Sequence, residues 1–523
     1  MLGALPVARD LLARLDLVAT IDRLCPIQEK KARLTHGQVV AMLIANRLTA
    51  PTPLVHVEDW ARAWAVEEVF GIAPDALNDD RLGRALEALA EQADAVVGSI
   101  GAAAIAGFGL DVSRFHWDMT SISLYGAYEQ ADRDYATPKF GPPKDRRTDL
   151  KQIQTGLAVT GDGAVPLLAR AYDGGAAEIS QVEGALRALR DLAGERRFLL
   201  VGDRKLVSWA NLTAIDAAKV DFVAPAPRSI VSLAELAAHD PALATIVDWV
   251  PERDKDTFAH QRDLHRVVEG TTVLHGPKAC DTPFTVRTVF AHSAQRAAAS
   301  AETRQKKIDK ARVDLETVRR NLGTRYYPDE ATVRTRVEKI TADRGVGAWL
   351  RTHIDTDPDT GKPVFLWHFD TDALELAAKA DGWFALLTNQ GVEQADAAAV
   401  FTIYKGQEGA ERRHAAFKGP LAVDPVFLEN NKRIHGLLHV ICLALLVFSL
   451  IEREARRAAG PTGMVAGLYA RRPAKPTGRL VLEALSGLRL VPAHNGQPAY
   501  IPQPTPLQQR VLDILGVDPT KPP

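Results

Sequence analysis

The hydrophobic pattern of this chain changes its period near Val112, and that change limits the folds it can adopt. Up to about Gly109, apolar residues recur at the spacing of amphipathic helices, for example in THGQVVAMLIANRL and DDRLGRALEALAEQ. After Val112, the apolar residues Phe115, Trp117 and Met119 alternate with polar ones, which is the two-residue period of a strand. The sequence therefore predicts a helical segment followed by an α/β segment.

Strands and helices alternate through the second segment. The strand candidates IQTGLAVT and AVPLLARAY are joined by Gly161-Asp162-Gly163, a strong hairpin signal. A helix over about 179–193 precedes a continuous apolar run from Phe198 to Val201, as expected for a strand buried on both faces. A short helix from Ser208 and the strand DFVAPA follow. This order is typical of an α/β sheet with helical connections.

A β-rich insertion interrupts the series, with strand candidates TTVLHG, FTVRTVFAH, LRTHIDTD and VFLWHFD. Its charged helical arm, from about Ala291 to Leu322, is predicted to be a solvated helix with i,i+4 pairs rather than a DNA-contacting face. These changes in pattern divide the chain into a helical domain (1–110), a first α/β part (111–228), the insertion (229–380), a second α/β part with a helix (381–455) and a C-terminal tail (456–523).

Composition restricts the partners and the compartment. Lys and Arg number 64 against 65 Asp and Glu, so the net charge of −1 gives no overall attraction to a polyanion, and any nucleic-acid surface must be local. Cys25, Cys280 and Cys442 lie far apart, which favours a reducing cytoplasm over a disulfide framework. The N-terminus does not resemble a signal peptide. The most apolar run, Gly436 to Ile451, is short and contains His439, so we expect a buried core helix and no membrane association.

Two aspartates occupy positions at which α/β sheets carry functional groups. Asp118 lies inside the first strand, and Asp203 follows the strand that ends at Val201. The carboxyl ends of central strands are where open α/β sheets place their sites. Each residue can also have a purely structural role. Asp118 fits a residue at a strand edge, and Asp203 fits a helix cap or a turn.

The stretch YKGQEGAERRHAAFK supplies a third carboxylate, Glu411. Tyr404, Glu411 and Lys418 are seven residues apart, so a single helix puts them on one face, which Gln407 joins. The alternative is a solvated helix face with favourable charge spacing. Two Asp on strands and a longer Glu on a helix are hard oxygen ligands that suit Mg²⁺. Two such ions about 4 Å apart serve in-line displacement at phosphorus.

Three blocks of sequence resemble the catalytic blocks of bacterial insertion-sequence DDE transposases. They are HWDMTSISLYG, FLLVGDR and the Tyr404–Lys418 stretch, and the third is similar to the branch with Tyr-x2-Arg-x3-Glu-x6-Lys. LNDDRLGRALEAL and PKDRRTDLKQ resemble the same branch, and the likeness runs from about Leu2 to Gly516. Two positions depart from the pattern. Gln407 stands in place of Arg, which removes a charge expected on DNA phosphate, and Arg204-Lys205 stands in place of Arg-Gly.

The resemblance implies an α/β fold with an RNase H-like mixed sheet and helices, interrupted by the β-rich insertion and preceded by the all-helical domain. Asp118, Asp203 and Glu411 would be the catalytic residues and would hold Mg²⁺, as two ions, with Mn²⁺ as a substitute. Thr120 would order the carboxylate of Asp118. The side chains expected to contact DNA are Tyr404, Gln407, Lys418, Lys144, Arg146 and Arg147.

The implied activity is cut-and-paste DNA transposition by a homodimer on DNA. Residues 1–110 would bind the terminal inverted repeats, although a packed helical bundle without a DNA-reading helix fits their pattern equally well. The catalytic residues would hydrolyse a phosphodiester and join the freed 3′-OH to target DNA. Two alternatives stay open, a catalytically inactive DNA-binding protein on the same scaffold and a two-metal nuclease that does not join strands.

Two further sets of residues carry a functional and an ordinary interpretation. His435 and His439 have a spacing that can bind zinc, but their apolar setting without a third ligand predicts a core pair. Trp349 and Trp367 lie in the insertion, where an aromatic ring can stack on a flipped base. Core packing is the expectation for both tryptophans.

Overall fold

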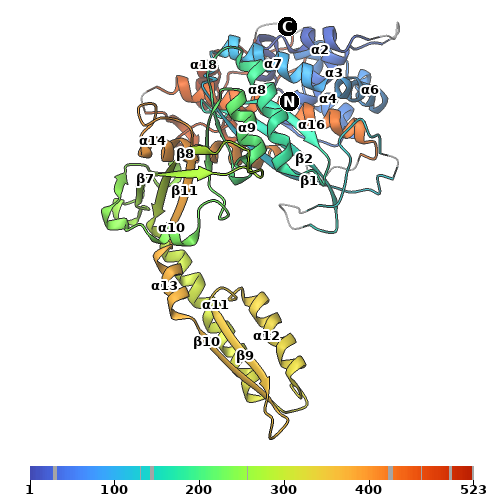
Figure 1. Cartoon of the computed structure of the whole chain (residues 1–523). Helices are drawn as coiled ribbons and strands as arrows, with labels where there is room; N and C mark the ends of the chain where they lie inside the picture. Colours follow the sequence, from blue (N-terminus) through green and yellow to red (C-terminus); the bar gives the residue numbers. More distant parts are fainter. Residues whose placement is uncertain are drawn as a thin grey trace. The chain divides into compact units, whose positions relative to one another are not determined.

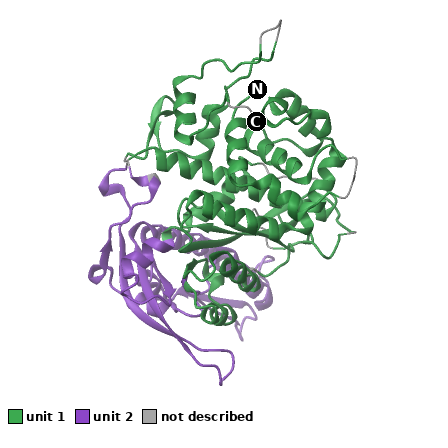
Figure 2. Ribbon diagram, turned by 90° about the horizontal axis from the view of Figure 1, so that it is seen from above, with its two compact units in different colours: residues 1–221, 405–523 green, residues 222–404 purple. Residues whose placement is uncertain are grey.

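The computed structural model forms two compact units, each built from helices and strands (Figures 1 and 2). Unit 1 comprises residues 1–221 and 405–523, and unit 2 comprises residues 222–404. Unit 2 thus contains the expected insertion together with flanking strands and a helix. The mixed α/β class expected from the sequence is confirmed. The described residues are 1–27, 32–129, 131–141, 147–255, 257–421, 428–460, 462–493 and 498–520.

Helices fill the described part of the first 108 residues, as the helical period predicts. Thr35 begins the third helix with a capping box to Gln38, and the Asn78 side chain accepts from the Arg81 backbone at the start of the sixth. The helices are α1 (Leu5–Arg14), α2 (Leu17–Leu24), α3 (His36–Thr49), α4 (Val57–Ala63), α5 (Val66–Phe70), α6 (Asp79–Glu91) and α7 (Ala93–Phe108).

The strands of unit 1 lie in the order β3-β2-β1-β4. The neighbours β1 and β2 are antiparallel, as are β2 and β3, whereas β1 and β4 are parallel. The hairpin predicted at Gly161-Asp162-Gly163 joins β2 to β3, so that prediction is confirmed. The bounds are β1 (Arg114–Leu124), β2 (Lys151–Thr160), β3 (Pro166–Tyr172), α8 (Val182–Ala193), β4 (Leu199–Val201), the short 3-10 helix η4 (Arg204–Leu206) and α9 (Trp209–Ala217).

The helix α16 (Asn431–Ala458) is the central core element of unit 1. It packs against α3, α6 and β3. Its length and hydropathy would suffice to cross a membrane, but 94% of its most apolar window is buried inside the protein, as expected of a core helix. The bent pair α6 and α7 passes the same test only if the two helices count as one span. The C-terminal part adds α15 (Glu408–Lys418), β12 (Val465–Tyr469), β13 (Arg472–Ala474), α17 (Gly478–Leu485) and α18 (Pro506–Leu515).

The strands of unit 2 are antiparallel and lie in the order β5-β11-β8-β7-β6. Buried Phe290, Trp383 and Ala385 form a core with residues around α10. The bounds are β5 (Asp221–Pro225), α10 (Leu233–Ala237), β6 (Thr245–Val247), β7 (His265–Leu274), β8 (Phe284–Ser293), α13 (Thr371–Lys379), β11 (Trp383–Thr388) and α14 (Ala397–Lys405).

The helical arm of unit 2 is built from α11 (Ala294–Arg320), α12 (Glu330–Arg344) and the hairpin of β9 (Leu350–Thr356) and β10 (Pro363–Phe369), which lie side by side in Figure 1. Leu315, Val337 and Phe365 belong to a separate buried cluster. Ion pairs at i,i+4 spacing, such as Lys306–Glu302, cover the outside, as predicted. Trp349 and Trp367 are partly buried against this cluster, which supports the core interpretation.

Two helical glycines provide a matched test of this packing. A Cβ at Gly436 of α16 would meet the backbone oxygen of Leu86 on α6 at 2.1 Å, whereas a Cβ at Gly98 of α7 would meet nothing within 4 Å. We predict that Gly436→Ala lowers the free energy of unfolding by about 1–3 kcal/mol through overpacking. Gly98→Ala should raise it by about 0.5–1 kcal/mol through helix propensity. Urea unfolding measures both, and stabilisation by Gly436→Ala would contradict the packing of α16 on α6.

Candidate active site

Asp118 lies in β1, and Asp203 lies two residues after the end of β4, the strand parallel to β1. The pairing of β1 with β4 aligns His116 with Val201. Continuing along both chains for two residues aligns Asp118 with Asp203, whose backbone is extended with φ −80° and ψ −179°. Because side chains alternate along a strand, aligned residues of neighbouring strands point to the same face. The two aspartates therefore lie at corresponding positions along β1 and the extension of β4.

The helix α15 covers the same face of β1. The Gln407 side chain, at its start, donates from Nε2 to the Trp117 carbonyl at 3.0 Å, and its Oε1 lies 3.2 Å from Nδ1 of His116. Since Oε1 can only accept, the His116 ring donates. Burial and the nearby Arg114 lower the pKa of His116 to about 4, so the ring is neutral near pH 7.

A second contact between helix and strand lies two turns further along α15. Nε2 of His414 lies 3.5 Å from Oδ2 of Asp118. Gln407, Glu411 and His414 follow the i, i+4, i+7 spacing of one helix ridge. Glu411 is exposed and lies between two residues that contact β1. The three predicted carboxylates thus come from elements that meet at one face of the unit 1 sheet.

Arg413 fixes α15 to the rest of unit 1. Its guanidinium donates to the carbonyls of Gly163 at 2.7 Å and Ala164 at 2.9 Å in the β2–β3 hairpin. It also pairs with the Glu452 carboxylate of α16 at 3.1 and 3.2 Å, and the two side chains are only 4% and 7% exposed. Sequence reasoning missed Arg413. The available signal was Glu452, an acid directly after the apolar run of α16, which needs a buried cationic partner.

Each aspartate is oriented by a backbone group close to it in sequence. Oδ1 of Asp118 accepts from the Met119 N–H at 2.9 Å, and Oδ1 of Asp203 accepts from the Lys205 N–H at 2.9 Å as the cap of η4. The capping interpretation of Asp203 is therefore confirmed. The strand-edge interpretation of Asp118 is wrong, because β1 lies between β2 and β4.

The carboxylates of Asp118, Asp203 and Glu411 are of the type that binds Mg²⁺, since carboxylate oxygens are the ligands this ion prefers. Within the described ranges, however, no three His, Cys, Asp or Glu side chains are grouped closely enough to hold a metal ion. Mg²⁺ commonly binds through one or two carboxylates plus substrate phosphates and waters, so a preformed three-ligand site is not required. His435 and His439 form the expected core pair, with rings 4.5 Å apart, and burial lowers the pKa of His435 to about 3.

The expectation of one helix from Tyr404 to Lys418 is wrong. α14 ends at Lys405 and α15 begins at Glu408. Glycine at position 406 weakens a helix interior. At the same point the side chain of Gln407 is held by β1, and tight bonds from Gly409 to Gly406 and from Ala410 to Gln407 start α15 anew.

The other predicted residues are dispersed. Thr120 is buried two residues after Asp118, on the same face of β1. Tyr404 belongs to unit 2, where its ring lies 6.2 Å from Phe384. Lys418 ends α15 and is partly buried, and Arg147 forms an exposed pair with Asp149 at 2.7 Å. Lys144 and Arg146 lie outside the described residues.

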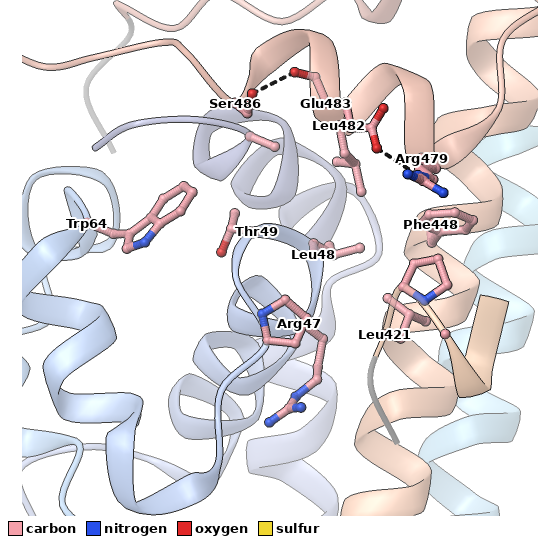
Figure 3. Close-up of a pocket in the computed structure, with 14 residues that line it drawn as sticks. Arg47, Leu48, Thr49, Trp64, Leu421, Phe448, Arg479, Leu482, Glu483 and Ser486 are labelled. Atoms are coloured by element: carbon pink, nitrogen blue, oxygen red, sulfur yellow. Dashed lines mark hydrogen bonds and ion pairs between the residues drawn. The ribbon is translucent and has the colours of Figure 1, made fainter. Parts of the chain in front are cut away.

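A pocket of about 450 Å³ in unit 1 does not include the three carboxylates (Figure 3). It lies between α3, α17 and the end of α15, with Leu48, Trp64 and Phe448 among its walls. Burial lowers the pKa of Arg47, which lines it, to about 10. Nε of Arg479 donates to the Glu483 carboxylate at 2.6 Å, so this guanidinium already has an acidic partner. This pocket and the candidate site at Asp118, Asp203 and Glu411 are therefore separate features.

The Arg413–Glu452 pair predicts a specific pH dependence. Burial raises the pKa of Glu452, but Arg413 and Arg456 outweigh it and hold the pKa below its ordinary value. The contribution of the carboxylate to stability is therefore complete above about pH 4.3 and is lost as the pH falls through the lower folded-state pKa. We expect Glu452→Gln to lower the free energy of unfolding by about 3 kcal/mol at pH 7.

Urea unfolding of the wild type and Glu452→Gln at pH 7 and at falling pH measures this effect. The difference between them should shrink in acid. Glu483→Gln, in an exposed pair whose side chains are 71% and 53% accessible, is the control and should change stability by less than about 0.5 kcal/mol. A Glu452→Gln deficit that stays constant at all pH values would contradict the assigned charge pair.

Comparisons with known proteins give limited matches. Residues 1–98 match the family model of a domain of unknown function, DUF4277. No curated protein matches the chain. The structure is similar to a piggyBac transposase synaptic complex with hairpin DNA at 8% identity and a TM-score of 0.38, covering 92% of this chain and 78% of that chain. A likeness of this size carries no argument about activity, and the family model covers only the N-terminal helices.

Proposed function

We propose that this chain is a DNA transposase with an RNase H-like core in unit 1 and a DDE catalytic site at Asp118, Asp203 and Glu411. The observation that carries the proposal is the parallel alignment of Asp118 with Asp203 together with α15 over the same face of β1. Three carboxylates from two strands and one helix match the ligand types that phosphodiester chemistry needs. The three sequence blocks that resemble DDE transposases contain the same residues.

The chemistry follows from the residue types. Bound Mg²⁺ or Mn²⁺, as two ions, would supply the charge that activates the attacking oxygen and stabilises the leaving one. Asp118 in β1 and Asp203 at the start of η4 hold their carboxylates in fixed directions through the N–H groups of Met119 and Lys205. Glu411 approaches from the helix. Hydrolysis and strand joining are both displacements at phosphorus, so one site serves both.

DNA contacts are proposed around this site. Tyr404, Lys418, Lys144, Arg146 and Arg147 are the candidate contacts, and residues 1–110 are the candidate reader of the terminal inverted repeats. The buried bonds of Gln407 to β1 support an anchoring role for this residue in place of the phosphate contact that Arg makes in the resembling branch. The proposed assembly is a homodimer on DNA, in the cytoplasm, in accord with the free thiols of Cys25, Cys280 and Cys442.

A second candidate is a catalytically inactive DNA-binding protein on the same scaffold. Two observations favour it. In the described part of the chain no three-ligand metal cluster is preformed, and Gln407 replaces the Arg of the resembling branch. This protein would bind the same DNA ends, and substitution of Asp118 would change only stability.

A cleavage assay on DNA that carries the ends flanking the gene distinguishes the transposase from the inactive DNA-binding protein. We predict metal-dependent cutting and joining by the wild type with Mg²⁺ or Mn²⁺, and a loss of at least about a thousandfold in Asp118→Asn, Asp203→Asn and Glu411→Gln, since metal-ion stabilisation is worth several kcal/mol. DNA binding, measured by mobility shift, should remain.

Glu408→Gln is the matched control, because it removes an acidic side chain from the same helix three residues before Glu411. Its activity should stay within about threefold of the wild type, as for a surface change. DNA binding without cutting by the wild type would select the inactive DNA-binding protein. Cutting without strand joining would select the nuclease.

A further inference from the structure

Unit 2 contains a pocket of about 470 Å³ between the first half of α11, the end of α13, the start of β11 and Trp349. A volume of this size suits a small organic ligand, since ligand pockets typically measure about 300–1,000 Å³. All residues that line it belong to unit 2, so it is separate from Asp118, Asp203 and Glu411. Its charge and its walls indicate which ligand it fits.

The pocket carries more positive than negative charge. Four cationic side chains line it, Arg228, Arg296, Arg304 and Lys307, and Asp381 is the one carboxylate among its lining residues. Asp381 is fully engaged by Arg304, with bonds of 2.8 and 2.6 Å and both side chains 14% exposed. Three positive charges therefore lack a carboxylate in the pocket.

Two of these cations are held near each other. Burial and the charge of Arg296 lower the pKa of Arg228, which means that the two guanidinium groups repel one another. Arg296 lies over the ring of Phe384 with its guanidinium carbon 5.3 Å from the ring centroid, which limits its freedom to move away. Among the residues that the structure describes, neither Arg228, Arg296 nor Lys307 forms an ion pair with an acid. A bound anion would relieve the repulsion.

Aromatic side chains also line the pocket. Trp349 and Trp383 line the pocket together with small side chains. Trp383 is 2% exposed, and its Nε1–H finds no hydrogen-bond partner in the described chain. An unsatisfied buried donor costs free energy. A cationic side joined to an aromatic side fits a ligand with a phosphate and a planar ring.

We propose that this pocket binds a free nucleoside monophosphate. The phosphate lies among Arg228, Arg296 and Lys307, and the base lies against the partly exposed ring of Trp349. The pocket is too small for a duplex, and its charge exceeds what a neutral nucleoside needs. This site is independent of the transposase activity proposed for unit 1, so either proposal can fail alone.

The test is a titration of the full-length protein with AMP at low salt, followed by calorimetry. Adenosine and ribose 5-phosphate are the comparison ligands. We expect saturable AMP binding that is at least about tenfold tighter than either fragment, because stacking and phosphate contacts add. Arg228→Ala with Arg296→Ala should weaken AMP binding by at least about tenfold, as expected when charge-assisted bonds are lost.

Two further variants distinguish a bound ligand from general charge attraction. Arg319→Ala with Arg320→Ala removes two charges from the same helix outside the pocket, and AMP affinity should stay within about twofold. Trp349→Leu, with its thermal unfolding checked, should weaken AMP but not ribose 5-phosphate. The proposal is overturned if AMP does not saturate, if both double variants behave alike, or if only a DNA oligonucleotide binds.

Discussion

The buried contact between Arg413 and Glu452 is the interaction on which the rest of unit 1 depends. Arg413, a residue of α15, joins this helix to two other elements, because its guanidinium binds both the β2–β3 hairpin and the α16 helix. Glu452 also pairs with Arg456 and accepts from the Gly478 N–H at the start of α17. A charge pair with so little exposure stabilises only when every donor and acceptor is satisfied. This network holds the helix of Glu411 over the strand of Asp118.

The local patterns predicted most of the elements but little of their contacts. The period change at Val112, the Gly161-Asp162-Gly163 hairpin and the apolar run of α16 are local signals, and the structure contains the elements they predict. The break of the helix at Gly406 was missed because it depends on Gln407 binding β1, 290 residues away in sequence. Arg413 was missed for the same reason, since its partners lie 39 and 250 residues away.

The candidate site was predictable to different degrees. Asp118 and Asp203 follow from strand patterns, but their alignment depends on the parallel pairing of β1 with β4, which the sequence pattern did not predict. The position of Glu411 rests on tertiary anchors that the sequence pattern does not reveal, and Tyr404 lies in the other unit. The aspartates are oriented by backbone groups next to them in sequence, so the direction of each carboxylate is set locally. Glu411, in contrast, is exposed.

The most direct test of this account asks whether the three carboxylates share a metal. Fe²⁺ substituted for Mg²⁺ in the complex with DNA ends cuts the protein backbone near the bound ion when ascorbate and peroxide are added. The account predicts cuts in three segments, around Asp118, Asp203 and Glu411, in the wild type, and their joint loss in Asp118→Asn. Cuts confined to a single one of these segments, or located elsewhere in the chain, would contradict a shared site.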